Sequence, residues 1–296
     1  MTRLDEKERY FRDFSVWPTH AKLNIRGWLT NFLPEELPTA QKLISSLVFF
    51  NEQMTDALFR GALQNYLASL HGDVKFSQPP STINLDEVAF VLCEGEVPHP
   101  TDSAHLFARK LRDSFNVPSH SIYRPADALN QLSWKKHYIF FDDFAGSGNQ
   151  FIDTIERNHP DAPQFQSYAE LINQNTHTIA YCPCICTKTA EVNIARKYPG
   201  IKLSPSHILG PESNSTLPQS RVWSGVARAE ADDGILHIQN SSFRAGYTAT
   251  DGSQDGWRGF HELGLLLAFA HGIPDASLPI LYSTRNNWTP LIGRAQ

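Results

Sequence analysis

The stretch that decides the fold is Tyr138-Ile-Phe-Phe-Asp-Asp-Phe-Ala-Gly-Ser-Gly-Asn-Gln150. Its first four residues form an unbroken apolar run, which is typical of a strand buried on both faces of a parallel sheet. Two adjacent acids and a group of small residues follow, and Phe151, Ile152 and Ile155 then recur at helical spacing before Pro160. A strand, a short loop and a helix in this order predict one unit of an α/β fold.

The sequence on both sides repeats this alternation. Residues 88–93 (Val-Ala-Phe-Val-Leu-Cys) and residues 178–182 (Thr-Ile-Ala-Tyr-Cys) are short β-prone apolar runs. The first precedes a helical pattern that begins at the capping residues Asp102 and Ser103, and the second precedes a helical stretch over residues 190–197. We therefore expect an α/β fold in which a mostly parallel sheet is flanked by helices.

The N-terminal part of the chain carries a helical pattern. Apolar residues within residues 39–70 recur at close to helical spacing, which predicts one long helix. Its apolar row indicates packing within the chain or at the seam of a homo-oligomer, and both remain open. The Pro-Pro pair in residues 77–82 indicates a linker. We expect a helical N-terminal region over residues 1–78 and an α/β domain over residues 79–296.

The C-terminal third has a weaker pattern. Residues 203–255 are rich in Ser, Gly and Pro, and they predict loops or a hood-like insertion. Residues 263–269 and 278–282 are apolar and predict two further strands, separated by the turn-like Gly272-Ile-Pro-Asp275. Trp288 is expected to pack in the core, and stacking on a nucleotide base is the alternative.

Composition and charge narrow the class of protein. The chain has 296 residues and a formal net charge of −5, so it lacks the basic surplus typical of non-specific nucleic-acid binders. Its longest apolar stretch, residues 265–270, is far shorter than the roughly 20 residues of a membrane-spanning helix, and no membrane partner is expected. The N-terminus is densely charged and lacks the apolar core of a secretory signal, which favours the cytoplasm.

Three of the four cysteines lie in Cys182-Pro-Cys-Ile-Cys186. Their alternate spacing would place all three thiols on one face of a strand. Cysteine is among the most buried residue types, and no nearby His or Cys pair completes a Zn²⁺ site. A buried core strand is therefore favoured over a metal site, and no metal ligand is assigned.

The segment after the central strand has the composition of a phosphate loop. Gly146, Ser147 and Gly148 allow the backbone to approach a ligand closely. Asn149 and Gln150 open a helix whose first N–H groups lack partners within the helix. The two acids before this loop can accept hydrogen bonds from vicinal hydroxyls. A phosphate bound at one end and a diol at the other describe the two faces of a ribose 5-phosphate.

These residues resemble the signature of type I phosphoribosyltransferases, in which apolar residues precede two acids and a phosphate loop. The resemblance implies a phosphoribosyltransferase-like fold, with Asp142 and Asp143 as the catalytic residues that bind the ribose hydroxyls of phosphoribosyl pyrophosphate (PRPP). It implies that the loop from Ala145 to Gln150 binds the 5-phosphate. It also implies Mg²⁺ as the cofactor, which accompanies the pyrophosphate in that family.

The loop after the first strand of the domain departs from that family. Glu94-Gly-Glu-Val-Pro-His-Pro100 stands where a basic residue followed by Gly usually binds pyrophosphate. Two acids without Lys or Arg would repel pyrophosphate unless Mg²⁺ intervenes. By position, Glu94 and Gly95 are still carried over as ligand-binding residues, together with Asp102 and Ser103 at the following helix start.

The C-terminal portion as a whole resembles phosphoribosyltransferase-like effectors of bacterial conflict systems, such as retron-type anti-phage modules. The features that carry this resemblance are the helix start at Asp102 and Ser103, the acid-pair loop and residues 278–294. The resemblance implies a ribose-phosphate or nucleotide ligand, and protein or ribonucleoprotein partners of a defence system.

Three functions remain open. The first is an enzyme that uses PRPP and Mg²⁺. The second is a non-catalytic module that retains the ribose-phosphate site to sense a nucleotide or to scaffold partners, and the acidic loop is its best support. The third is a Mg²⁺-dependent nuclease with paired acids, which fits the Gly-Ser-Gly loop poorly.

Overall fold

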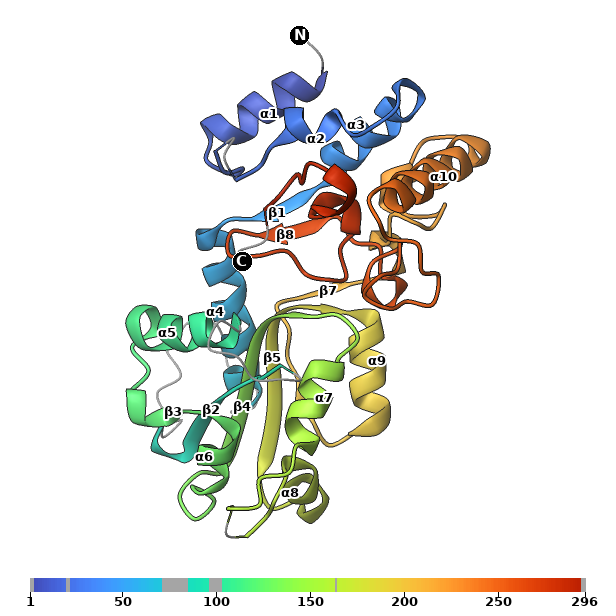
Figure 1. Ribbon diagram of the computed structural model, residues 1–296. Coiled ribbons are helices and arrows are strands. Elements are labelled where there is room, and N and C mark those ends of the chain that lie inside the picture. The colour runs from blue at the N-terminus through green and yellow to red at the C-terminus, as the bar shows by residue number, and fades with distance from the viewer. Residues whose placement is uncertain (1–2, 20–21, 71–84, 96–102, 163, 294–296) are drawn as a thin grey trace. The chain divides into compact units, whose positions relative to one another are not determined.

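The computed structural model describes residues 3–19, 22–70, 85–95, 103–162 and 164–293 (Figure 1). By their internal contacts the residues fall into two compact units. Met1–Thr55 and Gly210–Gln296 form unit 1, and Asp56–Leu209 forms unit 2. The linker expected at residues 77–82 lies outside the described residues, so the division expected after residue 78 stays a prediction.

Unit 2 contains a six-stranded parallel sheet. Its strands are β2 (Val88–Leu92), β3 (Ile122–Tyr123), β4 (His137–Ala145), β5 (Thr178–Thr187), β6 (Lys202–Leu203) and β7 (His207–Leu209). Their order is β3-β2-β4-β5-β6, and β7 pairs with the last residues of β5. Every pairing among these strands is parallel. The expected α/β fold with a mostly parallel sheet is confirmed.

Helices cover both faces of this sheet (Figure 1). On one face lie α5 (Ser103–Phe115) and the part of α4 (Glu52–Ser69) that belongs to unit 2. The other face carries α6 (Pro125–Leu129), α7 (Asn149–Glu156), α8 (Tyr168–Gln174) and α9 (Lys188–Lys197). The alternation of side chains along β4 requires both layers, because Phe140 faces Phe151 of α7 whereas Phe141 faces Phe59 of α4.

The strand order creates a topological switch between β2 and β4. From β2 the chain first returns to the sheet at β3, on one side of β2, and then at β4, on the other side. In open parallel sheets, ligands bind in the crevice outside the carboxyl ends of two such strands. The residues that follow β2 and those at the carboxyl end of β4 therefore meet where a ligand site is expected.

β4 and β5 both run further than their apolar runs predict. β4 continues through Asp142 and Asp143 to Ala145, because this stretch pairs with β5 in one parallel register. β5 likewise continues to Thr187. The acid pair thus lies inside a strand, and the turn before α7 is limited to residues 146–148.

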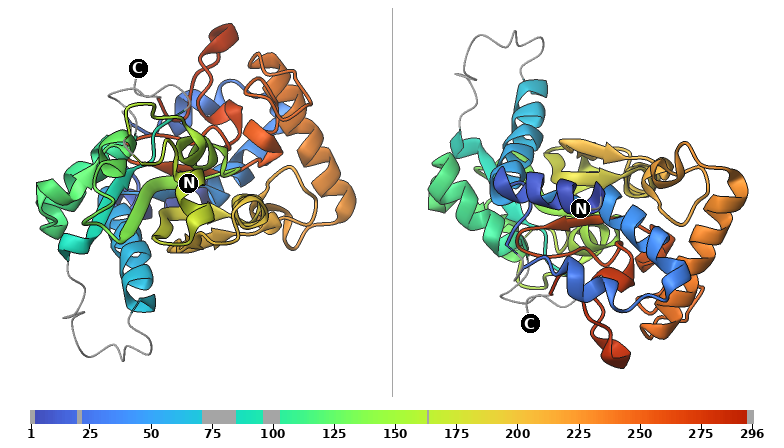
Figure 2. Two further views of the ribbon diagram at one scale, coloured as in Figure 1. Left: turned by 90° about the horizontal axis from the view of Figure 1, so that it is seen from below. Right: turned by 90° about the horizontal axis from the view of Figure 1, so that it is seen from above.

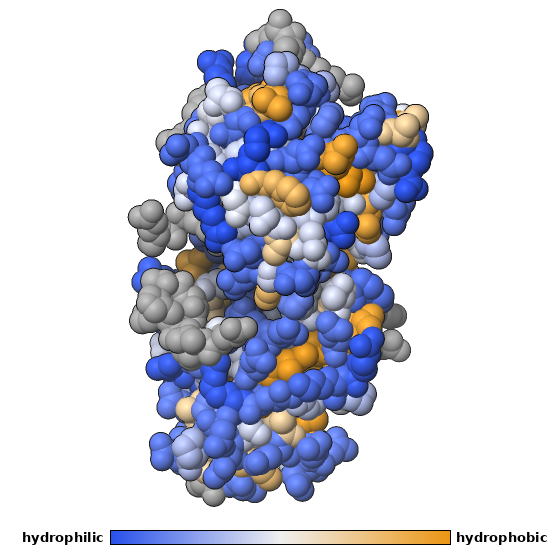
Figure 3. All heavy atoms as spheres, turned by 45° about the vertical axis from the view of Figure 1, so that its right-hand side comes forward, coloured by the Kyte–Doolittle hydropathy of each residue, from blue (hydrophilic) through white to orange (hydrophobic). Residues whose placement is uncertain are grey.

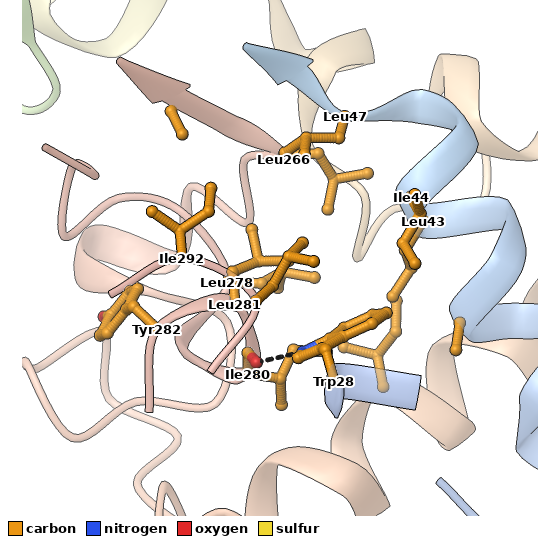
Figure 4. Packing of buried hydrophobic residues seen from close by; sticks show 14 of the residues in the cluster. Trp28, Leu43, Ile44, Leu47, Leu266, Leu278, Ile280, Leu281, Tyr282 and Ile292 are labelled. Atoms are coloured by element: carbon orange, nitrogen blue, oxygen red, sulfur yellow. Dashed lines mark hydrogen bonds between the residues drawn. The ribbon is translucent and has the colours of Figure 1, made fainter. Parts of the chain in front are cut away.

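Unit 1 combines the N-terminal helices with the C-terminal part of the chain, which lie side by side in Figures 1 and 2. Its elements are α1 (Arg3–Asp13), α2 (Ile25–Leu29), α3 (Leu37–Ser46), β1 (Val48–Phe50), α10 (Arg228–Arg244) and β8 (Leu267–Phe269), and β1 pairs with β8 in parallel. In the core of this unit, Trp28 packs among residues from both chain parts and donates from Nε1 to the Ile280 carbonyl oxygen at 2.6 Å (Figure 4). Trp288 is buried in the same core and donates to the same oxygen at 2.9 Å, which confirms the expected core position.

Short 3-10 helices occur between these elements. In unit 1 they are Pro34–Glu36, Pro211–Ser213, Arg221–Trp223, Phe260–Glu262, Pro279–Leu281 and Arg285–Asn287, and in unit 2 they are Leu85–Glu87 and Ser119–Ser121. The helical N-terminal region is confirmed as helical. The apolar residues of α2 and α3 are buried against the C-terminal part of the same chain, whereas Phe59 of α4 packs within unit 2.

The single helix predicted over residues 39–70 is wrong in its middle. α3 ends at Ser46, and Val48–Phe50 forms β1 before α4 begins. β-branched and aromatic residues favour a strand, and β8 supplies the pairing partner. Asn51 then caps α4, because its Oδ1 accepts a hydrogen bond from the Met54 backbone N–H at 2.9 Å.

Two predictions for the C-terminal part are also wrong, and one is confirmed. Residues 203–255, expected as loops, contain the 17-residue helix α10. Its Gly234 has a packing role, because a Cβ there would lie 2.3 Å from Cη2 of Trp223. Residues 278–282, expected as a strand, contain the 3-10 helix Pro279–Leu281, since proline lacks the N–H that a ladder needs. The strand expected within residues 263–269 is β8.

Within the described part of the chain, every helix falls short of the length and apolar composition that crossing a bilayer requires. The molecular face drawn in Figure 3 is mostly polar, and its apolar side chains form small scattered groups.

Candidate functional site

The acid pair of β4 lies at the carboxyl end of the strands next to the topological switch. Asp142 is aligned with Pro183 of β5 in the sheet. Only 1% of its surface is exposed. Asp143, the next residue, is half-buried and has access to solvent. The two neighbouring acids therefore differ in how a ligand could reach them.

Three groups form hydrogen bonds with the Asp142 carboxyl. Its Oδ1 accepts a hydrogen bond from the Asp143 backbone N–H at 2.9 Å and contacts Ser103 Oγ at 3.0 Å. Its Oδ2 accepts one from Nε2 of Gln150, at 3.3 Å. Burial, and then the charge of Asp143, raise the pKa of Asp142 well above its ordinary value. The carboxyl is thus held by three groups, and its ionised form is disfavoured relative to that of an exposed aspartate.

Ser103 joins the first turn of α5 to both acids. Its Oγ lies 3.0 Å from Asp142 Oδ1 and 3.1 Å from Asp143 Oδ1. The helix start after β2 and the acid pair of β4, which the sequence identified separately, are therefore in contact. Asp102, assigned with Ser103 as a ligand-binding residue, lies outside the described residues.

The turn after β4 has the geometry of a close backbone bend. Gly148 has φ +82° and directly precedes α7. A Cβ at this position would lie 3.0 Å from Cγ1 of Ile194 in α9, so glycine is required both by its backbone angle and by the space. The Ser147 Oγ accepts a hydrogen bond from the Asn149 backbone N–H at 3.3 Å. Asn149 and Gln150 are exposed in the first turn of the helix.

The turn is fixed from behind by β5 and α9. The Thr187 hydroxyl donates to the Gly146 carbonyl oxygen, and Nδ2 of Asn193 donates to the Ser147 carbonyl oxygen at 3.0 Å. Ala145, just before the turn, is buried. Because its carbonyl groups are bound toward the protein, the turn and the N-terminal end of α7 form a preorganised group of backbone donors.

Glu94 and Gly95, which follow β2, are bound by arginines that no sequence pattern pointed to. Glu94 is only 6% exposed, and its carboxylate accepts hydrogen bonds at 3.0 Å from both Arg124 Nε and Arg157 Nη1. Nη2 of Arg157 also donates to the Gly95 carbonyl oxygen at 2.5 Å. Arg124 follows β3 and Arg157 follows α7, and no sequence spacing linked either of them to Glu94. The charge of Glu94 is therefore balanced inside the protein.

The family of this chain follows from comparison with known proteins. A family model described as PRTase-CE matches residues 25–294. The chain belongs to the PRTase-CE family. The matched residues include the acid pair and its turn and draw on both units, and they support a phosphoribosyltransferase-like protein. No curated protein and no solved structure matches this PRTase-CE chain significantly.

A metal ion has few candidate ligands in the described residues of this PRTase-CE chain. Among them, no group of three or more His, Cys, Asp and Glu side chains is placed to hold a metal ion. Mg²⁺ is usually held by substrate phosphates and water with only one or two protein carboxylates. Such a donor set fits an ion that arrives with pyrophosphate, and the Mg²⁺ expectation stays a prediction.

The cysteine motif of the PRTase-CE chain belongs to the sheet. Cys182, Cys184 and Cys186 lie in β5, and all three are buried and free. Burial raises the pKa of each thiol, that of Cys186 to about 12. Thiolates, which bind metals, are thus disfavoured here. The expected buried core strand is confirmed.

The structure brings most of the assigned site residues together. Thr154 of α7 connects two of the groups, because its hydroxyl contacts the Glu94 carbonyl oxygen at 2.7 Å and the Gln150 carbonyl oxygen at 2.8 Å. Glu94, Gly95, the acid pair, Ser103 and the turn therefore form one continuous arrangement. Their roles toward a ligand stay predictions.

Proposed function

We propose that this protein binds PRPP, or a closely related ribose 5-phosphate, at the acid pair of β4 and the turn before α7, and that it acts as a phosphoribosyltransferase. The observation that carries the proposal is the position of Asp143. Asp143 is half-buried at a topological switch, and only two residues separate it from a glycine-bounded turn that opens a helix. Family membership supports the same class of protein.

The turn supplies the phosphate half of the proposed site. The first N–H groups of α7 have no acceptors within the helix, and the positive end of the helix dipole lies there. Gly146 is half-buried, and the side chains of Asn149 and Gln150 are exposed in the first turn of the helix. A phosphate dianion suits this group of donors.

The acid pair supplies the ribose half. Carboxylates accept hydrogen bonds from hydroxyl groups, and acceptors held in fixed positions orient the sugar ring for reaction. In the transfer reaction, the bond between ribose C1 and pyrophosphate breaks and an acceptor forms a new bond to C1. Mg²⁺ bound with the substrate would neutralise charge on the departing pyrophosphate.

A role as an effector in bacterial anti-phage defence completes the proposal. It is supported by the resemblance of the C-terminal portion to phosphoribosyltransferase-like conflict effectors. Its partners would be a nucleotide or ribose-phosphate ligand and protein or ribonucleoprotein components of the defence system. Phage plaque counts in cells that carry the gene in its natural neighbourhood, with and without Asp143→Ala, test this role. Equal plaque counts would rule it out.

A non-catalytic nucleotide sensor is the alternative. Its main support was the acidic loop that would repel pyrophosphate. Arg124 and Arg157 weaken that support, because Glu94 is bound to both and presents no free negative charge. The ion triad therefore weakens the support that Glu94 gave to the sensor.

Calorimetric titration with PRPP and Mg²⁺, paired with a pyrophosphate-release assay over bases and nucleotides, tests the proposal. We expect saturable binding and pyrophosphate release, and we expect Asp143→Ala to abolish release. Tight binding without release across all acceptors would establish the sensor instead. A lack of binding to the wild-type protein would overturn both, and cleavage of DNA or RNA without PRPP would favour the nuclease.

A further inference from the structure

Two aromatic side chains lie exposed next to each other on α1 and the turn that follows it. Tyr10 is 58% exposed and Phe14 is 67% exposed, and their ring centroids are 4.7 Å apart. Of the Phe, Tyr and Trp side chains that the structure describes, only these two and Trp134 of unit 2 have more than half of their surface exposed. Single exposed apolar residues are ordinary, whereas neighbouring exposed aromatics are typical of the centre of a protein interface.

The opposite side of α1 is fixed to the rest of unit 1, beside α2 and α3 (Figure 1). Leu4 belongs to the hydrophobic core of the unit, and Lys7 Nζ donates to the Ser45 carbonyl oxygen in α3. Arg12 Nη2 donates to the Leu23 carbonyl oxygen at 3.0 Å. Because the helix is held from behind, its exposed side chains are preorganised, which lowers the entropic cost of binding a partner.

Two charged side chains lie next to the rings. Arg9 and Asp13 are exposed and are four residues apart, as Tyr10 and Phe14 are. Among the described residues, neither Arg9 nor Asp13 forms a hydrogen bond or an ion pair through its side chain. Residues four apart lie in one row along a helix, so the two charges form one row and the two rings form the row beside it.

These two rows are complementary to themselves when one helix is reversed. A twofold axis between antiparallel helices brings equivalent rows together, so charges meet charges and rings meet rings. Reversal places Arg9 of one copy opposite Asp13 of the other, and Tyr10 opposite Phe14. The centres of the two rows differ by one residue, which is about 1.5 Å along the helix, so one arrangement satisfies both rows. A parallel arrangement would bring like charges together.

We propose that α1 is a self-association surface, which binds α1 of a second copy of this chain in antiparallel orientation. Tyr10 and Phe14 form its apolar centre, and Arg9 of each copy binds Asp13 of the other. The 11 residues of α1 span only about 16 Å, so the contact belongs to the small class of interfaces. We therefore expect a reversible dimer with a dissociation constant of about 10–100 µM. This inference goes beyond the proposed function, because the acid pair belongs to unit 2.

Sedimentation equilibrium of the full chain over about 1–300 µM tests self-association, and the average mass should rise toward that of a dimer. Phe14→Glu should raise the dissociation constant by about tenfold or more, because it places a charge in the apolar centre. Leu236→Glu is the matched control and should leave the constant unchanged, since Leu236 is an exposed apolar residue on another helix of unit 1. Circular dichroism and urea midpoints establish that each variant is folded.

Charge reversal tests the antiparallel pairing. Arg9→Asp gives a surface with two acids, and Asp13→Arg gives one with two arginines. Each variant alone should lose about tenfold in affinity for itself, because like charges then meet. An equimolar mixture of the two variants should form a heterodimer. The double variant exchanges the two charges, and it should recover the wild-type dissociation constant within about threefold.

The outcomes separate self-association from its geometry. A wild type that stays monomeric over the whole concentration range overturns the proposal. A dimer that Phe14→Glu leaves intact also overturns it, because self-association then uses another surface. If Phe14→Glu weakens the dimer but the mixed charge variants associate no better than either one alone, the antiparallel pairing is wrong. Failure of the wild type to bind PRPP would overturn the proposed function and leave this inference untouched.

Discussion

Two constraints, a positive φ and close packing, require glycine at position 148, just before α7. Its φ of +82° is strained for any residue with a Cβ, and a Cβ would also press on Ile194 at 3.0 Å and 3.1 Å. Gly225 has a similar φ of +80°, but nothing lies within 4 Å of its Cβ position. A comparison of alanine substitutions at Gly148 and Gly225 therefore separates the cost of backbone strain from the cost of steric crowding.

We expect Gly148→Ala to lower the free energy of unfolding by about 2–3 kcal/mol and Gly225→Ala by about 1–2 kcal/mol. Only the first should also weaken PRPP binding, because it displaces the turn that holds the phosphate. Urea denaturation and calorimetry measure the two effects. Equal stability losses, with PRPP affinity kept in both variants, would contradict the role given to this turn.

The buried thiols make a second prediction at this scale. All four cysteines are free and buried, and burial raises the pKa of each. Since the thiolate is the reactive species, iodoacetamide at pH 7.5 should leave the native protein unlabelled and should label all four sites after unfolding. Mass spectrometry counts the labels. Rapid labelling of Cys186 in the native protein would show that the end of β5 opens.

Among elements, the loop after β2 and the end of α7 are joined by the ion triad of Glu94, Arg124 and Arg157. Arg157 has only 21% of its side chain exposed, whereas Arg124 has 60% exposed. Removing a cation from a buried carboxylate costs more than removing one that water can replace. The two arginines should therefore contribute differently to the free energy of unfolding.

Arg157→Ala should reduce stability by about 2–3 kcal/mol, and Arg124→Ala by less than about 1 kcal/mol. The combination of Arg157→Ala with Glu94→Gln should recover part of the loss, because the buried charge is removed as well. Urea unfolding of the wild type, Arg157→Ala, Glu94→Gln and the double variant completes this double-mutant cycle. A loss in the double variant equal to the sum of the single losses would show that the pair is not coupled.

The three central strands of unit 2 could be predicted because each contains a short apolar run followed by capping or turn residues, whereas the short strands β3, β6 and β7 lack such a run. β2, β4, α5, α7 and α9 lie where the patterns place them. β1 was missed, because Val48–Phe50 continues the helical spacing of its neighbours and is a strand only through pairing with β8. α10 was missed because Gly234 and its polar residues hide a periodicity that packing against Trp223 enforces. Tertiary partners, which no local pattern contains, decided both.

In the candidate site, likewise, the residues that are neighbours in the sequence could be predicted, whereas the contacts between distant residues could not. The acids and the turn are close neighbours in the sequence, so the connectivity of the chain alone keeps them close in space. The contact of Ser103 with the acids depends on strand order, and the pairing of Glu94 with Arg157 depends on where a helix ends. The burial of Asp142 depends on neighbours from several elements. These long-range facts give the two acids their different properties.

At the scale of the whole molecule, each unit has its own core and its own spectroscopic signal. Of the six tryptophans, Trp134 belongs to unit 2 and is 75% exposed. The other five belong to unit 1 and are buried: Trp17, Trp28, Trp223, Trp257 and Trp288. Tryptophan fluorescence therefore follows the unfolding of unit 1.

Trp288→Ala should destabilise unit 1 by about 3–5 kcal/mol, because it empties a buried site beside Phe32 and removes a hydrogen bond to Ile280. The fluorescence transition should move to lower urea concentration. Trp134→Ala is the control, and it should leave the midpoint of unfolding within about 0.5 kcal/mol. Equal shifts in both variants would contradict the core position of Trp288.

The parallel pairing of Val48 with Leu267 has a consequence for biosynthesis. Asp56–Leu209 is one continuous segment, so it has emerged completely from the ribosome before most of unit 1's C-terminal half exists. The N-terminal helices wait for their partner strand for roughly 10–40 s at ordinary translation rates of about 5–20 residues per second. During that interval their apolar side chains are exposed to the cell, and a chaperone that shields nascent chains would be expected to bind there first.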